Sequence, residues 1–140
     1  MQTPKATDIQ AFLAEVFPQI DSQFHIESVT EQGALVRMPR HEKHLRPGGT
    51  VSGPAMFALA DVSMYIALLG RIGLEALTVT TNCSIDFLRK PSAEADMLCD
   101  VTILKLGKTL AVGNARLFSE GMEQPVATAT LTYAIPPKRD

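Results

Sequence analysis

The sequence predicts an α+β fold in which one antiparallel β-sheet wraps around a long central apolar helix. The first observation is the segment 55–69, which is apolar at nearly every position, so a helix made from it must be enclosed on all sides. The second is a set of strand-like runs, two before this segment and four after it, several joined by short connections that favour antiparallel neighbours. The third is that no other long apolar helix is available to cover the first, which leaves a curled sheet to do so.

The chain is expected to open with a short amphipathic helix and a β-hairpin. Residues Thr7 to Gln10 fit the capping-box pattern, and Pro18 is expected to end the helix. The apolar residues that recur at helical spacing in between are Ile9, Phe12, Leu13, Val16 and Phe17. Residues 24–31 and 33–39 then read as two strands joined at Gln32-Gly33.

The polar segment 40–49 is predicted to be an exposed loop that leads into the central helix and is well placed to line a site. Gly53 and Pro54 favour a helix start, because proline has a fixed φ and lacks the amide hydrogen. The apolar run that follows is shorter than the ~20 residues that cross a bilayer, and it contains Asp61. We therefore expect it to be buried inside the protein.

After the helix, residues 77–87 alternate between apolar and polar side chains, which predicts a long strand with one buried face. The apolar set is Leu77, Val79, Thr81, Cys83, Ile85 and Phe87. Three further strands are predicted over residues 97–106, 109–118 and 126–135. Residues 136–140 form a tail to which we assign no function.

Length and charge narrow the class of protein. The 140 residues suit one domain over 1–140, and a net charge of −2 provides no electrostatic footprint for general nucleic-acid or membrane binding. Cys83 and Cys99 lie within strand patterns and lack metal-ligand spacing, so we expect buried thiols in a reducing compartment. No apolar segment precedes the first helix, so we expect no signal peptide and a cytoplasmic protein.

Asp61 is the candidate functional residue. It is the one charged side chain between Arg46 and Arg71, and burying a bare carboxylate is costly. It could serve chemistry, or it could be a structural residue bonded to a neighbouring backbone group or hydroxyl. His41 and His44, spaced i, i+3 without a third ligand, are a weak metal signal, and we predict no metal site.

Four segments of the chain resemble a known family. They are GGTVSGPAMFALAD (48–61), TVTTNCSIDFLRKP (78–91), KLGKTLAV (105–112) and PVATATLTY (125–133). Their order and spacing resemble the hotdog fold, and within it the PaaI-like acyl-CoA thioesterases. The resemblance covers roughly residues 30–135.

The resemblance implies roles for particular residues. Asp61 would be the catalytic carboxylate, as general base or nucleophile, and the Gly53 N–H would polarise the thioester carbonyl at the helix start. Thr80 would help to position the attacking water. Ser52 stands where the family has a histidine, and its hydroxyl can still donate a hydrogen bond. Arg46 stands where relatives carry a water-orienting asparagine, and would bring positive charge toward the acid.

The resemblance also implies partners. Arg89, Lys90, Lys105 and Lys108 would lie near the nucleotide end of bound coenzyme A, although solvated strand ends would equally account for them. Coenzyme A enters only as part of the substrate, and no cofactor is expected. The site would lie at the subunit interface of a homodimer, possibly paired into a homotetramer.

Two other functions are compatible with this pattern. One is a non-catalytic protein that binds acyl-CoA or another small ligand and has lost the family histidine. The other is hydration or dehydration of an enoyl thioester, which the absence of paired Asp and His around the central helix disfavours.

Overall fold

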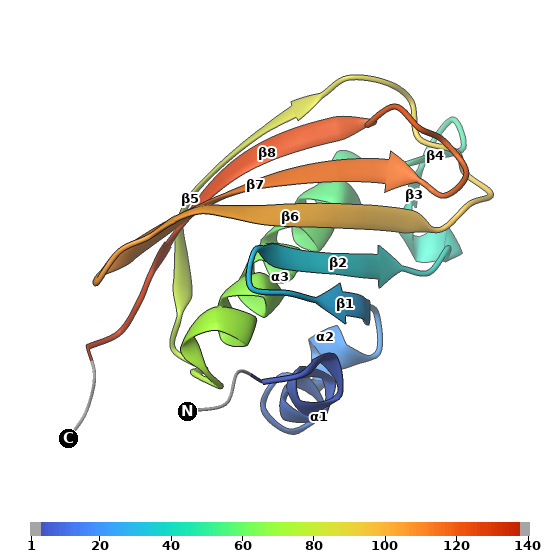
Figure 1. The fold of residues 1–140 in the computed structure, drawn as a ribbon. Helices are drawn as coiled ribbons and strands as arrows, with labels where there is room; N and C mark the ends of the chain where they lie inside the picture. Colours follow the sequence, from blue (N-terminus) through green and yellow to red (C-terminus); the bar gives the residue numbers. More distant parts are fainter. Residues whose placement is uncertain (1–3, 138–140) are drawn as a thin grey trace.

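The computed structural model describes residues 4–137 and confirms the predicted α+β architecture. A six-stranded antiparallel sheet has the strand order β1-β2-β6-β7-β8-β5 and curls around helix α3 (Figure 1). The sheet strands are β1 (His25–Val29), β2 (Gly33–Met38), β5 (Val79–Phe87), β6 (Met97–Leu106), β7 (Leu110–Ser119) and β8 (Ala127–Ala134). Part of the predicted tail, residues 138–140, lies outside the described residues.

Helix α3 (Gly53–Ile72) is the centre of the core. Its 20 residues are long and apolar enough to cross a membrane, with a mean hydropathy of 1.5 over the most apolar 18-residue window. The prediction that this segment is too short to cross a bilayer was therefore wrong, although the predicted burial inside the protein is confirmed. Burial explains the composition instead, because 72% of that window lies inside the protein. Leu59, Ile66 and Leu69 are among its fully buried side chains.

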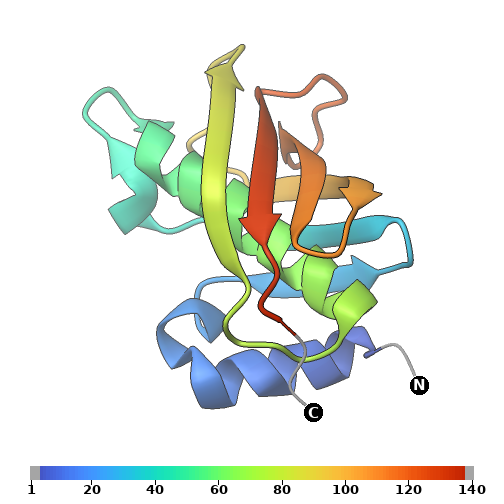
Figure 2. The same ribbon diagram turned by 90° about the vertical axis from the view of Figure 1, so that its left-hand side faces the viewer.

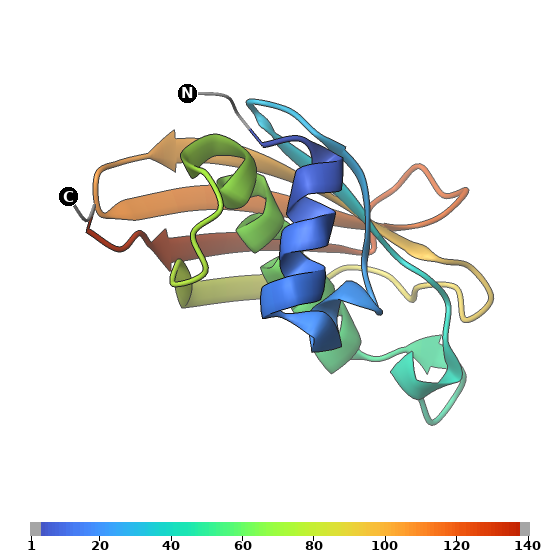
Figure 3. The same cartoon turned by 90° about the horizontal axis from the view of Figure 1, so that it is seen from below.

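Of the two N-terminal helices, α1 packs against α3 and β1 (Figure 3), and α2 packs against α1. Helix α1 (Ala6–Val16) begins earlier than predicted, because Asp8 accepts a hydrogen bond from the Lys5 N–H at 2.9 Å. Lys5 rather than Thr7 is thus the residue at the helix start. Pro18 ends α1 as predicted but also begins a further short helix, α2 (Pro18–Asp21), which the sequence did not suggest.

The segment before α3 is more ordered than the predicted loop. It contains a 3₁₀ turn, η1 (Glu42–His44), and a small hairpin of β3 (Leu45–Arg46) and β4 (Thr50–Val51). The hairpin turns at Gly48 and Gly49, both with positive φ, where residues other than glycine would be strained. Ser52 N–H donates to the His44 carbonyl at 2.7 Å, which ties this segment to the start of α3.

Strand β5 departs from strict alternation. The pairing with β8 shifts register between Thr80 and Asn82, so that Thr80 faces Tyr133 and Cys83 faces Leu131. Thr80 therefore shares the inner face with Cys83, while Val79 pairs with Ala134 and is 53% exposed. The predicted apolar face was wrong for Leu77, Val79 and Thr81, because the inserted residue reverses the alternation there.

Candidate functional site

The least buried face of α3 is a stripe of four residues spaced i, i+3, i+4 and i+7. Pro54 and Phe57 are exposed, and Ala58 and Asp61 are half-buried. Phe57, a large apolar residue, is 40% exposed. The stripe faces β5, the strand at one edge of the sheet (Figure 2).

The Asp61 carboxylate is held at one end of this stripe by two hydroxyl groups. Thr80 Oγ1 donates to Asp61 Oδ1 at 2.5 Å, and the Tyr133 hydroxyl lies 2.7 Å from the same oxygen. The β5 bulge makes the first contact possible, since it turns Thr80 toward the helix. Within residues 4–137, no hydrogen bond or ion pair engages Asp61 Oδ2, so this oxygen remains available to a reactant.

Tyr133 is the residue at this site that the sequence interpretation missed. It is 3% exposed and stacks on Tyr65 with ring centroids 6.5 Å apart. Burial, together with the negative charge of Asp61, holds the pKa of the Tyr133 phenol well above its usual value, so the phenol stays protonated. The available signal was a tyrosine at a buried position of the last strand, where a hydroxyl needs a partner.

The start of α3 presents one unused amide. Ser52 caps the helix by accepting from the Ala55 N–H at 3.2 Å, and its carbonyl accepts from Met56 N–H. Pro54 has no amide hydrogen. Among the described residues, Gly53 N–H is therefore the donor of this first turn that no hydrogen bond engages. The Phe87 ring from the far end of β5 lies beside Gly53, 3.3 Å from where a Cβ would be.

Asp61 lies at one end of the stripe, and Gly53 directly precedes Pro54 at its other end. The step of eight positions from Gly53 to Asp61 corresponds to about 12 Å along the helix axis. The Gly53 N–H also points away from Asp61, because helical amides point toward the N-terminus. The two predicted catalytic groups are therefore not brought together within one chain.

The predicted cationic residues divide between the same two ends. Lys105 and Lys108 lie at or beside the β6–β7 turn, which is at the Asp61 end of the sheet. The strand pairing shows this, because Leu106 pairs with Ala111, Ala111 with Tyr133, and Tyr133 with Thr80. Arg89 and Lys90 follow β5 at the Gly53 end, where the Arg89 guanidinium donates to the Pro125 carbonyl at 2.6 Å. Arg46 is exposed on β3, and no hydrogen bond or ion pair of residues 4–137 joins it to Asp61.

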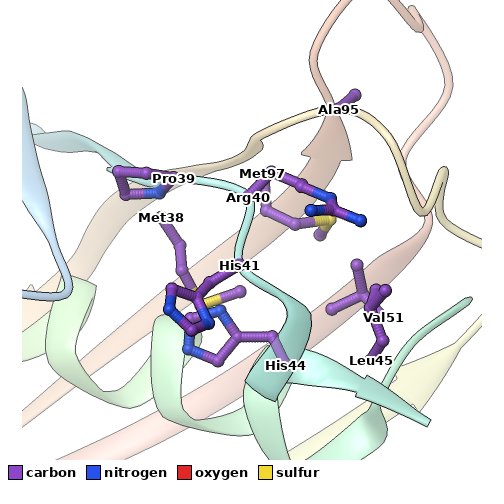
Figure 4. A pocket seen from close by; sticks show the side chains of 9 residues that line it. All are labelled: Met38, Pro39, Arg40, His41, His44, Leu45, Val51, Ala95 and Met97. Carbon is purple, nitrogen blue, oxygen red and sulfur yellow. The ribbon is translucent and has the colours of Figure 1, made fainter.

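The segment 40–51 lines a separate small cavity (Figure 4). Its volume of about 10 Å³ suits a single water molecule and is too small for an acyl group. The His44 ring reaches it, and His44 Nδ1 is buried without a hydrogen-bond partner in the described chain. Burial, followed by the charges of Lys43 and His41, lowers the pKa of His44. Asp61 is not among the residues that line this cavity. The segment is connected to the start of α3 through the Ser52–His44 hydrogen bond, and its role in lining the site stays a prediction.

Both cysteines are unpaired thiols within the sheet. Burial raises the pKa of Cys99 to about 12, and burial with the nearby Asp61 charge raises the pKa of Cys83. A thiol with a raised pKa is a weak nucleophile at neutral pH. Asp61 therefore remains the reactive group favoured at this site.

Comparison with known proteins agrees with this architecture. Residues 48–126 match the model of the thioesterase superfamily. A crystal structure of a proposed thioesterase from a Silicibacter species is 54% identical, with a TM-score of 0.90 over 98% of this chain and 95% of that chain. No curated protein matches the chain.

Two more distant structures share the fold. The phenylacetic acid degradation protein PaaI from Thermus thermophilus is 23% identical, with a TM-score of 0.73 over 85% of this chain and 99% of its own. A hypothetical thioesterase from Streptococcus pneumoniae, solved with coenzyme A, is 20% identical, with a TM-score of 0.72 over 84% of this chain and 91% of its own. With a wrapped central helix, a matching family model over more than half of its length and a relative that is 54% identical, the chain belongs to the thioesterase superfamily and has the hotdog fold.

Proposed function

We propose that the protein is an acyl-CoA thioesterase that works as a homodimer, with Asp61 as the catalytic carboxylate. The observation that carries this proposal is the Asp61 carboxylate, which is held through Oδ1 on the half-exposed stripe of α3, while no described residue engages Oδ2. Oδ2 would take a proton from water that attacks the thioester carbonyl carbon, and the C–S bond would then break to expel the thiolate, which takes up the proton. Alternatively, Oδ2 would attack that carbon itself and expel the thiolate, and water would then hydrolyse the resulting mixed anhydride and restore Asp61. The products are a carboxylic acid and the free thiol of coenzyme A.

The Gly53 N–H is the proposed donor to the carbonyl oxygen as it gains negative charge. An amide at a helix start combines an unused hydrogen with the positive end of the helix dipole. It must lie about 3 Å from that oxygen, while the attacking atom lies about 3 Å from the adjacent carbon. The separation of about 12 Å between Gly53 and Asp61 in one chain is too large for this. A complete site therefore needs two chains.

The geometry of β5 favours a second copy of this chain as the source of the missing group. Asp61 binds Thr80 at the start of β5, and Gly53 contacts Phe87 at its end. If two β5 strands pair antiparallel about a two-fold axis, the start of one strand lies beside the end of the other. Asp61 of one copy would then face Gly53 of the second copy, and each dimer would have two sites.

The same pairing would gather the predicted cationic residues. Lys105 and Lys108 of one copy would approach Arg89 and Lys90 of the second copy. Within a single chain these two pairs lie near opposite ends of β5. Such a group would suit the phosphates of coenzyme A. The coenzyme A bound to the Streptococcus pneumoniae relative supports this substrate class.

The test is release of free thiol from a panel of aliphatic and aromatic acyl-CoAs, followed with a thiol-reactive dye. We expect Asp61→Asn to lower kcat by roughly 10²- to 10⁴-fold, the usual contribution of a positioned acid or base. Asp100→Asn is the matched control, because the Asp100 side chain is exposed on the outer face of β6, away from α3 and from the β5 edge, and this variant should retain wild-type turnover.

The outcomes separate the candidate functions. Loss of turnover in Asp61→Asn with normal turnover in Asp100→Asn would support the proposal. Equal turnover in wild type and Asp61→Asn would refute the role of Asp61. Tight binding of acyl-CoA without thiol release from wild type would instead indicate a binding protein. Ser52→His, which restores the family histidine, would then be the first variant to test for activity.

A further inference from the structure

The buried hydroxyl of Tyr133 makes two close approaches to one aspartate. It lies 2.7 Å from Asp61 Oδ1 and 2.8 Å from the Asp61 carbonyl oxygen. A phenol has a single proton to donate. The carbonyl of Asp61 lies inside α3, where backbone oxygens already accept helical N–H groups, while Oδ1 belongs to a carboxylate and makes the stronger, charge-assisted bond. Oδ1 is therefore the favoured acceptor.

The Tyr133 hydroxyl is a permanent donor in this position. The raised pKa of the phenol keeps the proton in place across the working range of an enzyme. Its ring stacks on Tyr65, and its backbone is fixed by the pairing of β8 with β5 and β7. The donor is thus rigid as well as protonated.

Two donors on one carboxylate oxygen make the two oxygens different. The last torsion of an aspartate is broad and nearly two-fold, so an unrestrained carboxylate exchanges its oxygens freely. Here Thr80 from β5 and Tyr133 from β8 both engage Oδ1, and Oδ2 is left without a partner in the described residues. Resting on the proposed function, we infer that Tyr133 is a positioning residue that, with Thr80, selects Oδ2 as the reactive oxygen.

Tyr65 provides a matched control within the same cluster. Its ring stacks on Tyr133, and its hydroxyl lies 3.4 Å from the Ala76 carbonyl. Tyr65→Phe removes one hydroxyl from the same pair of stacked rings, as Tyr133→Phe does, but this hydroxyl does not contact Asp61. A difference between Tyr133→Phe and Tyr65→Phe therefore isolates the bond to the carboxylate from the packing of the rings.

The experiment compares kcat and KM of wild type, Tyr133→Phe and Tyr65→Phe, together with crystal structures of the two variants. We expect Tyr133→Phe to lower kcat about 10- to 100-fold, the scale of a lost positioning contact, with KM changed less than about twofold. Tyr65→Phe should stay within about twofold of wild type in both. Thr80→Val should resemble Tyr133→Phe, and Thr80→Ser, which keeps a hydroxyl, should restore most of kcat.

The crystal structures test the positioning without relying on activity. In Tyr133→Phe the Asp61 carboxylate should rotate or occupy two orientations, while in Tyr65→Phe it should keep the wild-type orientation. The inference would be overturned if the Asp61 carboxylate kept its wild-type orientation in Tyr133→Phe. It would also be overturned if Tyr133→Phe kept the wild-type kcat while Asp61→Asn lost turnover. Either result would leave the proposed function standing. If wild type releases no thiol, the proposed function fails, and the carboxylate orientation alone decides the role of Tyr133.

Discussion

The two edges of the sheet are protected very differently. At the β1 edge, Gln10 of α1 accepts from the Ile26 N–H at 3.1 Å, and its amide group donates to Asp21 at 2.6 Å. A register shift between Ile26 and Ser28 further interrupts that edge. At the β5 edge no helix of the described residues covers the strand (Figures 1 and 2). Phe87 and Leu88, at the end of this strand, are 52% and 51% exposed.

The difference indicates where the protein is complete and where it is not. Exposed strand edges invite pairing, and proteins that stay monomeric block them with side chains, bulges or charges. The β1 edge carries such protection, while the β5 edge exposes apolar side chains beside Asp61 and Gly53. We expect the proposed partner and the proposed active site to share the β5 edge.

Charge placed on the β5 edge should give the largest effect. Asn82→Lys combined with Ser84→Lys would oppose lysines across the proposed two-fold axis, and like charges facing each other across strands are destabilising. We expect the dimer to become a monomer and thiol release to fall more than about tenfold, since each site needs two chains. Light scattering at micromolar concentration measures the mass.

The control variant introduces two lysines on the β1 edge instead, as His25→Lys combined with Ser28→Lys. Both residues are exposed on β1, so mass and turnover should match wild type. A wild-type protein that is already monomeric, or equal effects at both edges, would contradict the comparison.

Removal of one cation from each end of β5 should affect substrate binding. We expect Lys90→Gln combined with Lys108→Gln to raise KM for acyl-CoA about tenfold, equivalent to about 1.4 kcal/mol, with kcat unchanged. A thioester of N-acetylcysteamine, which lacks the nucleotide phosphates, should show no change in KM. Lys5→Gln, at the start of α1, serves as the control. A similar rise in KM for the truncated thioester would show that these lysines do not act through phosphate.

The ion cluster near the β1 edge should affect stability rather than turnover. Arg37 Nη1 lies 2.8 Å from Asp96 and 2.7 Å from Glu120, and the Arg40 N–H donates to Asp96 at 2.7 Å. We expect Asp96→Asn to lower the free energy of unfolding at pH 7 by about 1–2 kcal/mol, as measured by urea titration, with normal kcat.

The pH dependence of that effect follows from the sign of the pKa shift. The Arg40 N–H, followed by Arg37, lowers the pKa of folded Asp96 below its ordinary value of 3.8. The unfolded chain then binds more protons, so this stabilisation is complete above about pH 4 and is lost as pH falls through the lowered pKa. The difference between wild type and Asp96→Asn should therefore shrink at pH 3. A constant difference from pH 7 to pH 3 would rule out this linkage.

The smallest effect is expected at the base of β5. Thr78 is 4% exposed, and its hydroxyl has no hydrogen-bond partner in the described part of the chain. Thr78→Val keeps the shape and removes the buried hydroxyl, so we expect the free energy of unfolding to rise by up to about 1 kcal/mol. Thr102→Val, on the exposed part of β6, is the control and should change it by less. Destabilisation of Thr78→Val would mean that the hydroxyl is bonded after all.

Periodicity predicted most of the elements, because burial of an apolar face imposes its period on the sequence. The hairpin at Gln32-Gly33 and strands β6, β7 and β8 are where alternation predicted them. Strand β5 was predicted with the wrong face at its start. A bulge inserts one residue without changing the composition of the strand, so no alternation pattern reveals it.

The candidate site shows the same division. Asp61 was evident from the sequence, because a single charge in an apolar helix is a local anomaly. The Tyr133 contact was not evident, since its partner lies 72 residues away and depends on the register of β8 against β5. The separation of Asp61 from Gly53 could have been read from helix geometry alone.

The amino-acid sequence by itself determined that a sheet wraps one apolar helix and that this helix carries one acid, because the free-energy cost of exposing apolar groups and burying charge arises locally, residue by residue. The tertiary structure decided which oxygen of that acid is held, which helix amide is left free and which sheet edge is left uncovered. Each of those depends on strand register and on contacts between distant segments, which no local pattern specifies.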